Sequence, residues 1–218
     1  MSKVPEKIHP LGGKKIELPY RYTRLHYLEG KGDQWIDTGL YVTPGCDMRI
    51  DITACCMAYY GRSQALFGVQ RLDNGYRSNC AWLWFDTASS FCNCRLEWGG
   101  SDIYYTHVLS DVSGNTFYRM YCDGTRFIAG DGEVDVVSTY TNFQCDESHG
   151  TCLLFSGRRD GNPHYAFIGR VAYCLIKYGK KHAREFIPAL DPEGVPCMFD
   201  SVEKKPYYNQ GSGQFTYG

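Results

Sequence analysis

The chain has 218 residues, with 23 Lys and Arg against 24 Asp and Glu, so its formal net charge is −1. Charged residues make up 22% and hydrophobic residues 43%, which is typical of a globular protein and excludes a disordered one. The balanced charge removes any general electrostatic reason to expect nucleic-acid binding, and no apolar run reaches the roughly 20 residues that membrane insertion as a helix needs.

Residues 1–19 differ in composition from the rest of the chain. They hold three Pro, two adjacent Gly and four Lys without a sustained period, which predicts an extended N-terminal arm. From residue 20 to 218 short apolar or alternating runs follow one another without a linker, so we predict a single domain there. The start also lacks the apolar region of a secretory signal, which predicts synthesis in a cytoplasm.

The runs after residue 20 have the pattern of β-strands. In Cys46–Cys55, apolar Met48, Ile50 and Ile52 alternate with polar residues, which predicts a strand with one wet face. Leu25–Leu28 and Gln34–Asp37 flank the segment EGKGD, which predicts a hairpin. Twelve or more such runs, separated by turn residues about every ten positions, predict an all-β, antiparallel two-sheet sandwich.

Eleven Cys give an odd number, so complete internal pairing is excluded. Cys55, Cys152 and Cys174 lie in apolar strand patterns, where a thiol acts as a small buried hydrophobe. The close spacings are CC and CNC, with no second C-x₂₋₄-C pair and no His pair to complete a zinc site. We therefore predict free, buried thiols and no metal ligands.

Two blocks at opposite ends of the chain carry a family resemblance. The first is YLEGKGDQWIDTG, residues 27–39, and the second is REFIPA, residues 184–189, followed by GVPCMFD, KPYYN and GQFTYG. Together they resemble the concanavalin A-like lectin/glucanase superfamily, in the laminin-G-like form common in phage and gut-bacterial surface proteins. The resemblance covers residues 21–218 and implies a jelly roll with its first and last strands close together. Phe215 and Tyr217 would then share one face and close the sandwich.

The resemblance does not extend to catalysis. Relatives that cleave glucans carry a strand motif E-x-D-x-x-E, whose acidic side chains share one face. The nearest match here is Glu133-Val-Asp135-Val-Val-Ser138, which lacks the third acid. The six His are scattered, and G-x-S-x-G and phosphate-binding glycine loops are absent. We therefore predict a protein that is not an enzyme and has no cofactor; calcium would come only by analogy with some relatives.

Weak candidates for ligand binding are aromatic and planar polar side chains, because sugars offer an apolar ring face and hydroxyls. Trp98, before two glycines, is expected at a loop tip, and Tyr104 and Tyr105 lie nearby. In the polar loop SGRRDGNP, residues 156–163, Arg158, Arg159 and Asp160 could contact a glycan or a protein, although a solvated loop tip explains them as well.

Two functions compete on these grounds. The first is a non-catalytic phage virion protein, made in the host cytoplasm, such as a tail appendage, a receptor-binding protein or a capsid auxiliary protein. Its partners would be other virion proteins or further copies of itself, with a cell-surface glycan as a further candidate. The alternative is a carbohydrate-binding module or glycan-processing protein on the surface of a gut bacterium, which the missing export signal places second. A shared sandwich fold does not decide between them.

Overall fold

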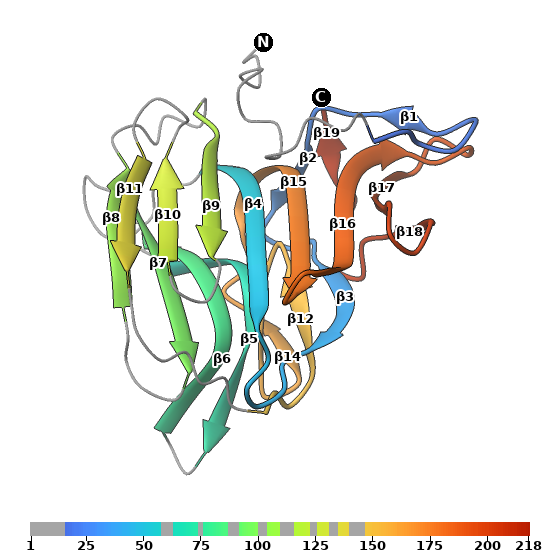
Figure 1. Ribbon diagram of the computed structural model, residues 1–218. Helices are drawn as coiled ribbons and strands as arrows, with labels where there is room; N and C mark the ends of the chain where they lie inside the picture. Colours follow the sequence, from blue (N-terminus) through green and yellow to red (C-terminus); the bar gives the residue numbers. More distant parts are fainter. Residues whose placement is uncertain are drawn as a thin grey trace.

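A computed structural model shows a protein built of β-strands (Figure 1). It describes residues 16–57, 63–73, 76–86, 92–99, 104–109, 116–122, 126–130, 135–139 and 147–218. Within these ranges there is no helix, and so no helix long and apolar enough to cross a membrane.

The larger sheet has 11 described strands, and its main path runs in the order β11-β10-β9-β4-β15-β16-β17-β18. Strand β1 pairs with β16, while β2 lies between β15 and β19. The bounds are β1 (Thr23–Arg24), β2 (Leu28–Lys31), β4 (Met48–Cys56), β9 (Tyr118–Cys122), β10 (Arg126–Gly130), β11 (Asp135–Thr139), β15 (Ile168–Tyr178), β16 (Lys181–Leu190), β17 (Pro196–Asp200), β18 (Lys205–Tyr207) and β19 (Thr216–Tyr217).

The smaller sheet has eight described strands, ordered β14-β13-β5-β6-β7-β8, with β12 pairing with both β5 and β3. The bounds are β3 (Ile36–Tyr41), β5 (Ser63–Asp73), β6 (Tyr76–Asp86), β7 (Cys92–Gly99), β8 (Tyr104–Leu109), β12 (Thr151–Leu154), β13 (Gly157–Arg159) and β14 (Asn162–His164). All described pairings are antiparallel except that of β13 with β5.

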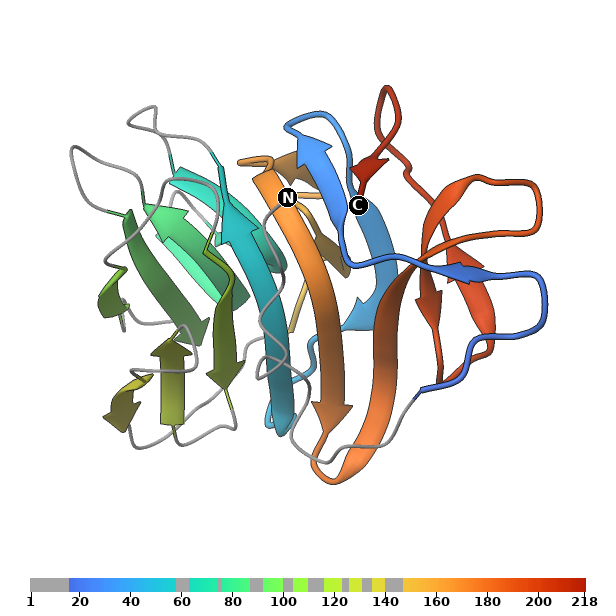
Figure 2. The ribbon, with the colours of Figure 1, turned by 90° about the horizontal axis from the view of Figure 1, so that it is seen from above.

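The two sheets form a sandwich, which confirms the predicted fold class. Figure 1 views the larger sheet with β4, β15 and β16 in front and strands of the smaller sheet behind, and Figure 2 turns the molecule by 90°. Met48, Ile50 and Ile52 of β4 point into the core between the sheets, as their alternation predicts. The core continues through the ring of Phe155, which lies 4.6 Å from that of Phe215 and 6.3 Å from that of Phe167.

The wet outer face predicted for β4 is only partly found. Arg49 is half-buried, but Asp51 and Thr53 are buried. Asp51 is covered because the Arg119 side chain of β9 binds it, and Thr53 has bulky Tyr173 of β15 as its cross-strand neighbour. The alternation along one strand predicts which face a residue lies on. It does not predict whether side chains of the neighbouring strands are long enough to cover that residue.

The hairpin predicted around EGKGD is wrong, because β2 and β3 belong to different sheets. The chain turns at Gly32, whose φ of 102° is in the region that favours glycine. The side chain of Gln34 then accepts a 2.7 Å hydrogen bond from the backbone N–H of Lys31. The segment therefore connects the two layers, where a two-stranded hairpin was expected.

The two ends of the chain lie close together, as the resemblance implied. Strand β19 pairs with β2, which brings the last residues of the chain against the first block. Asn209 Oδ1 accepts the backbone N–H groups of Trp35 and Gly211 at 3.0 and 2.9 Å. Phe215 is buried in the core, but Tyr217 is 48% exposed, so the expectation that both close the sandwich holds for Phe215 alone.

Among the eight cysteines whose side chains the structure describes, none forms a disulfide and seven are buried. Cys55, Cys152 and Cys174 are among the fully buried ones, as predicted. Burial in an apolar environment raises the pKa of Cys94 and Cys174 well above the ordinary thiol range, because it penalises the thiolate. These thiols therefore pack as apolar side chains.

Candidate functional site

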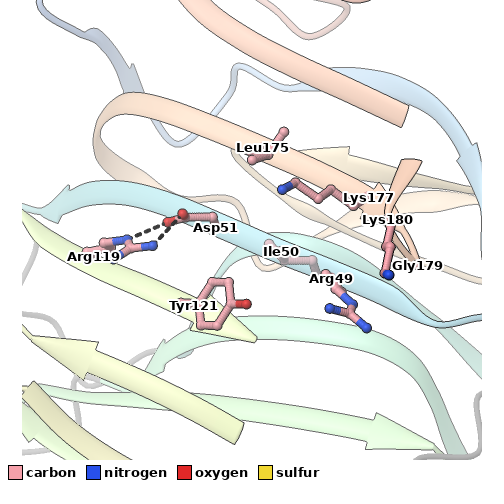
Figure 3. Close-up of a pocket in the computed structure, with 9 residues that line it drawn as sticks. All are labelled: Arg49, Ile50, Asp51, Arg119, Tyr121, Leu175, Lys177, Gly179 and Lys180. Carbon is pink, nitrogen blue, oxygen red and sulfur yellow. Dashed lines mark hydrogen bonds and ion pairs between the residues drawn. The ribbon is translucent and has the colours of Figure 1, made fainter. Parts of the chain in front are cut away.

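A hollow of about 250 Å³ lies on the outer face of the larger sheet, over β9, β4, β15 and the turn between β15 and β16 (Figure 3). The residues that line it are Arg49, Ile50, Asp51, Arg119, Tyr121, Leu175, Lys177, Gly179 and Lys180. Four of these side chains are cationic and one is a carboxylate, although the chain as a whole is nearly neutral. The local positive charge is therefore a property of this face.

Strand register explains how residues far apart in sequence gather here. Directly opposed residues of antiparallel strands carry their side chains on the same face. One row across the sheet contains Arg49, Lys177 and His182, from β4, β15 and β16. The next row begins with Tyr121 of β9 and Asp51 of β4 and continues through Leu175 and Glu185, the partners in β15 and β16. The hollow lies over the β9–β4–β15 part of these rows.

The side chains of Asp51 and Arg119 form the fixed centre of this arrangement. Arg119 donates Nε and Nη2 hydrogen bonds of 2.8 and 2.6 Å to the two carboxylate oxygens of Asp51. Such a bidentate pair fixes the plane of the guanidinium. The guanidinium carbon also lies 5.4 Å from the ring centroid of Tyr121, two residues along the same strand. The hollow therefore offers planar polar groups and an aromatic ring held in one geometry.

The other cations of the hollow differ in how they are balanced. Arg49 is paired with Asp47, whose carboxylate accepts bonds of 3.1 and 2.7 Å from its guanidinium. For Lys177 and Lys180, the described residues supply no ion pair and no side-chain hydrogen bond. The two arginines are thus neutralised locally, whereas the two lysines contribute the net positive charge.

Glu185 of β16 borders the hollow, and neighbouring hydroxyl groups form hydrogen bonds with both oxygens of its carboxylate. Glu185 Oε1 accepts the hydroxyl of Tyr173 at 2.8 Å, and its Oε2 accepts the hydroxyl of Ser201 at 2.5 Å. Burial, followed by the charge of Glu185, raises the pKa of Tyr173 above the ordinary range, so this hydroxyl stays protonated as a donor. Both oxygens of Glu185 therefore serve the fold.

Three of the residues predicted to bind a ligand, Arg158, Arg159 and Asp160, lie together at the β13–β14 hairpin of the smaller sheet. Arg158 donates to Asp37 Oδ2 at 2.6 Å and to the carbonyl of Thr151 at 2.9 Å. This guanidinium therefore links β3, β12 and β13. Its role within the fold is clear, and a contact with a ligand stays a prediction.

The other two residues of that hairpin differ in exposure. Arg159 donates to Gln70 Oε1 at 2.7 Å and lies 5.4 Å from the ring centroid of Tyr165. Asp160 is exposed at the turn, with a φ of 46° that is followed by 84° at Gly161. Two successive positive φ values are what a two-residue hairpin turn requires, which explains the Asp-Gly pair. None of these residues lines the hollow.

Trp98, Tyr104 and Tyr105 belong to β7 and β8, and their side chains lie outside the described part of the structure. The expectation of a loop tip at Trp98 is wrong for the backbone, since β7 continues to Gly99. The register opposes Tyr104 to Glu97 and Tyr105 to Leu96. Their proposed role in binding stays a prediction.

A metal centre was not expected from the sequence. Among the residues that the structure describes, no three His, Cys, Asp or Glu side chains gather in a way that could hold an ion. Calcium, considered by analogy alone, therefore has no assigned ligands here.

Sequence reasoning missed the hollow. The outward positions of β4 were visible in its alternation, but the side chains that complete the hollow come from β9 and β15, about 70 and 125 residues away. Their meeting depends on which strands are neighbours and in which register, and neither follows from a local pattern.

The fold is similar to those of several solved structures. A protein from Bacteroides ovatus, described as a "putative carbohydrate binding protein", matches with a TM-score of 0.51 and 10% identity, over 89% of this chain and 60% of that protein. The CBM40 of Ruminococcus gnavus IT-sialidase, bound to α2,3-sialyllactose, matches with a TM-score of 0.48 and 12% identity, over 73% and 92%. Domains LG4-5 of the mouse laminin α1 chain match with a TM-score of 0.46 and 8% identity, over 96% and 51%.

No family model and no curated protein matches the chain. At identities of 8 to 12% the structural likeness concerns the fold and says nothing about individual residues. The comparison supports a two-sheet β-sandwich, a fold similar to that of the Bacteroides ovatus protein.

Proposed function

We propose that this protein is a non-catalytic carbohydrate-binding module and that the hollow over β9, β4 and β15 is its sugar site. The observation that carries the proposal is the Asp51–Arg119 pair with Tyr121 beside it. Sugar binding needs planar polar groups for hydroxyls and an aromatic face for the apolar side of the ring, and this centre holds both in place.

The fold is compatible with this function. The Bacteroides ovatus protein, which has a similar sandwich, is described as a "putative carbohydrate binding protein". The fold alone does not assign a function, so the proposal rests on the chemistry of the hollow. Of the two functions considered from the sequence, the carbohydrate-binding alternative thus has the better support, while the virion role and the location stay predictions without support from these findings.

The non-catalytic part of the proposal follows from the acids of the hollow. Glycosidases use two carboxyl groups on either side of the scissile bond. The described lining holds one carboxylate, Asp51, and Arg119 occupies both of its oxygens. Glu185, the next acid in the same row, has both oxygens hydrogen-bonded as well. Binding without bond cleavage is what such a lining supports.

A glycan array with the full chain tests the proposal, with Tyr121→Ala as the site variant. We expect the native protein to bind a defined set of glycans and Tyr121→Ala to bind them about tenfold more weakly, since an aromatic contact and its buried area are lost. Tyr217→Ala is the matched control, because Tyr217 is exposed on β19 at a different part of the sheet. Equal losses in the two variants, or release of reducing ends from a bound glycan, would contradict the proposal.

A further inference from the structure

We infer that the sugar bound in the hollow carries an anionic group, a carboxylate or a sulfate, and that Lys177 and Lys180 recognise it. This inference rests on the proposed function and adds the class of ligand. The juxtaposition that carries it is a row of basic side chains at the β15–β16 end of the hollow, next to a pair of arginines that already have carboxylate partners.

The row of basic side chains should destabilise the folded sheet when no ligand is bound. Arg49 and Lys177 are directly opposed across β4 and β15, and His182 is opposed to Lys177 on the other side. The Arg49–Lys177 pair places like charges in directly opposed positions, which destabilises a sheet. Asp47 offsets the charge of Arg49, but the register provides no acid opposite Lys177. An anion bound between the strands would remove this repulsion.

Arginine and lysine side chains then recognise different parts of the ligand. Arg119 is held flat by Asp51, so it can donate to neutral hydroxyls in a fixed direction but adds no net charge. Lys177 and Lys180 are point charges on flexible stems, and both line the hollow together with Arg49 (Figure 3). Lysines of this kind suit a charged group whose exact position varies among related sugars. The hollow thereby separates recognition of the sugar ring from recognition of its charge.

The size and depth of the site fit a charged substituent on a saccharide. The hollow of about 250 Å³ is small for a whole oligosaccharide, so one residue of a longer chain would enter while the rest stays outside. Lys177 is half-buried, which reduces screening of its charge by salt, whereas Lys180 is exposed. We therefore expect Lys177 to contribute more to affinity than Lys180 at physiological ionic strength.

Matched pairs of saccharides that differ only in charge test this inference with the 218-residue chain. The pairs are oligogalacturonate and its methyl ester, chondroitin sulfate and its desulfated form, and sialyllactose and lactose, each titrated by calorimetry. We expect the acidic member of at least one pair to bind more than tenfold tighter. Lys177→Gln should reduce acidic binding about tenfold and Lys180→Gln about fivefold, and both should leave neutral binding unchanged.

Lys31→Gln is the matched control, because Lys31 is exposed and lies opposite Ile168. Lys177 lies nine positions further along β15 than Ile168, which is about 30 Å along a strand. A loss in Lys31→Gln equal to that in Lys177→Gln would overturn the inference, since the effect would then be one of total charge. Equally tight binding of a single-stranded DNA oligonucleotide would also overturn it, because the hollow would then be a general polyanion surface.

The remaining outcomes separate the inference from the proposed function. If neutral and acidic members bind equally well and Tyr121→Ala weakens both, the inference fails and carbohydrate binding stands. If no saccharide of the panel or of the glycan array binds, both fail. If acidic members bind better but the lysine variants keep the preference, the assignment to Lys177 and Lys180 is wrong.

Discussion

The carboxylate of Asp51 and the guanidinium of Arg119, 68 residues apart in the chain, form a two-bond ion pair across β4 and β9. The side chain of Asp51 is 8% exposed and that of Arg119 is 23% exposed, so water screens this pair only partly. The comparable pair of Asp47 and Arg49 lies on the same face with side chains 47% and 36% exposed. The two pairs therefore give a matched comparison of burial.

Replacing Asp51 with Asn should destabilise the protein by about 2 kcal/mol, because Arg119 keeps its charge in a half-buried position without a carboxylate. Asp47→Asn should cost less than about 0.5 kcal/mol, since exposed pairs contribute little. Urea denaturation followed by tryptophan fluorescence measures both. Equal losses in the two variants would show that burial does not set the strength of these pairs.

Asn209 should be a stabilising residue of the C-terminal segment. Its Oδ1 accepts two backbone N–H groups, and its Nδ2 donates to the carbonyl of Gly213 at 3.0 Å. Asn209→Ala leaves the N–H groups of Trp35 and Gly211 without this acceptor, so we expect a loss of about 2 kcal/mol in the free energy of unfolding. Asn162→Ala is the control, because the exposed Asn162 amide makes a single 3.3 Å bond to Asp160, and its loss should be within about 0.5 kcal/mol.

Gly211 is required by close packing, whereas Gly194 is required by backbone conformation. A Cβ at Gly211 would overlap the carbonyl of Asp33, so Gly211→Ala must displace a backbone segment and should cost about 3 kcal/mol. A Cβ at Gly194 would meet nothing within 4 Å, but its φ of 80° makes Ala unfavourable by about 1 kcal/mol. Thermal unfolding of the two variants should rank them in this order, and the reverse order would contradict the predicted clash.

The buried thiols should make the protein sensitive to alkaline pH. Burial, and then the charge of Asp191, raises the pKa of Cys197 to about 12, while unfolded thiols titrate near about 8.5. Between these values the unfolded chain has lost the proton that the folded chain keeps, so the free energy of unfolding falls as pH rises. Each such thiol contributes up to about 1.4 kcal/mol per pH unit, and Cys94 and Cys174 act in the same direction.

Urea midpoints between pH 7.5 and 10, measured with a reducing agent, check this dependence. We expect stability to be constant below about pH 8 and to fall above it. Cys197→Ala should show a shallower fall, because one of the titrating thiols is gone. A flat profile up to pH 10 would mean that these thiols are not excluded from water in the folded protein.

Local pattern and composition were sufficient for the fold class. The alternation in β4 places Met48, Ile50 and Ile52 in the core, and the burial of Cys55, Cys152 and Cys174 follows from their apolar surroundings in sequence. These predictions succeed because each depends on the period of one strand. The hairpin predicted at EGKGD is wrong because two strands joined by a turn pair only if they lie side by side in one sheet. Here the two strands belong to different sheets, which the pattern of one strand does not reveal.

By itself, the sequence predicted a β-sandwich with buried thiols from the period of its strands, and the family resemblance of the two terminal blocks implied that the ends of the chain lie together. Only the tertiary structure decided where charge accumulates. Asp51, Arg119 and Lys177 come from three strands, and register alone makes them neighbours. A shift of one residue in any strand would send its side chain to the opposite face, so the hollow exists only in the folded sheet.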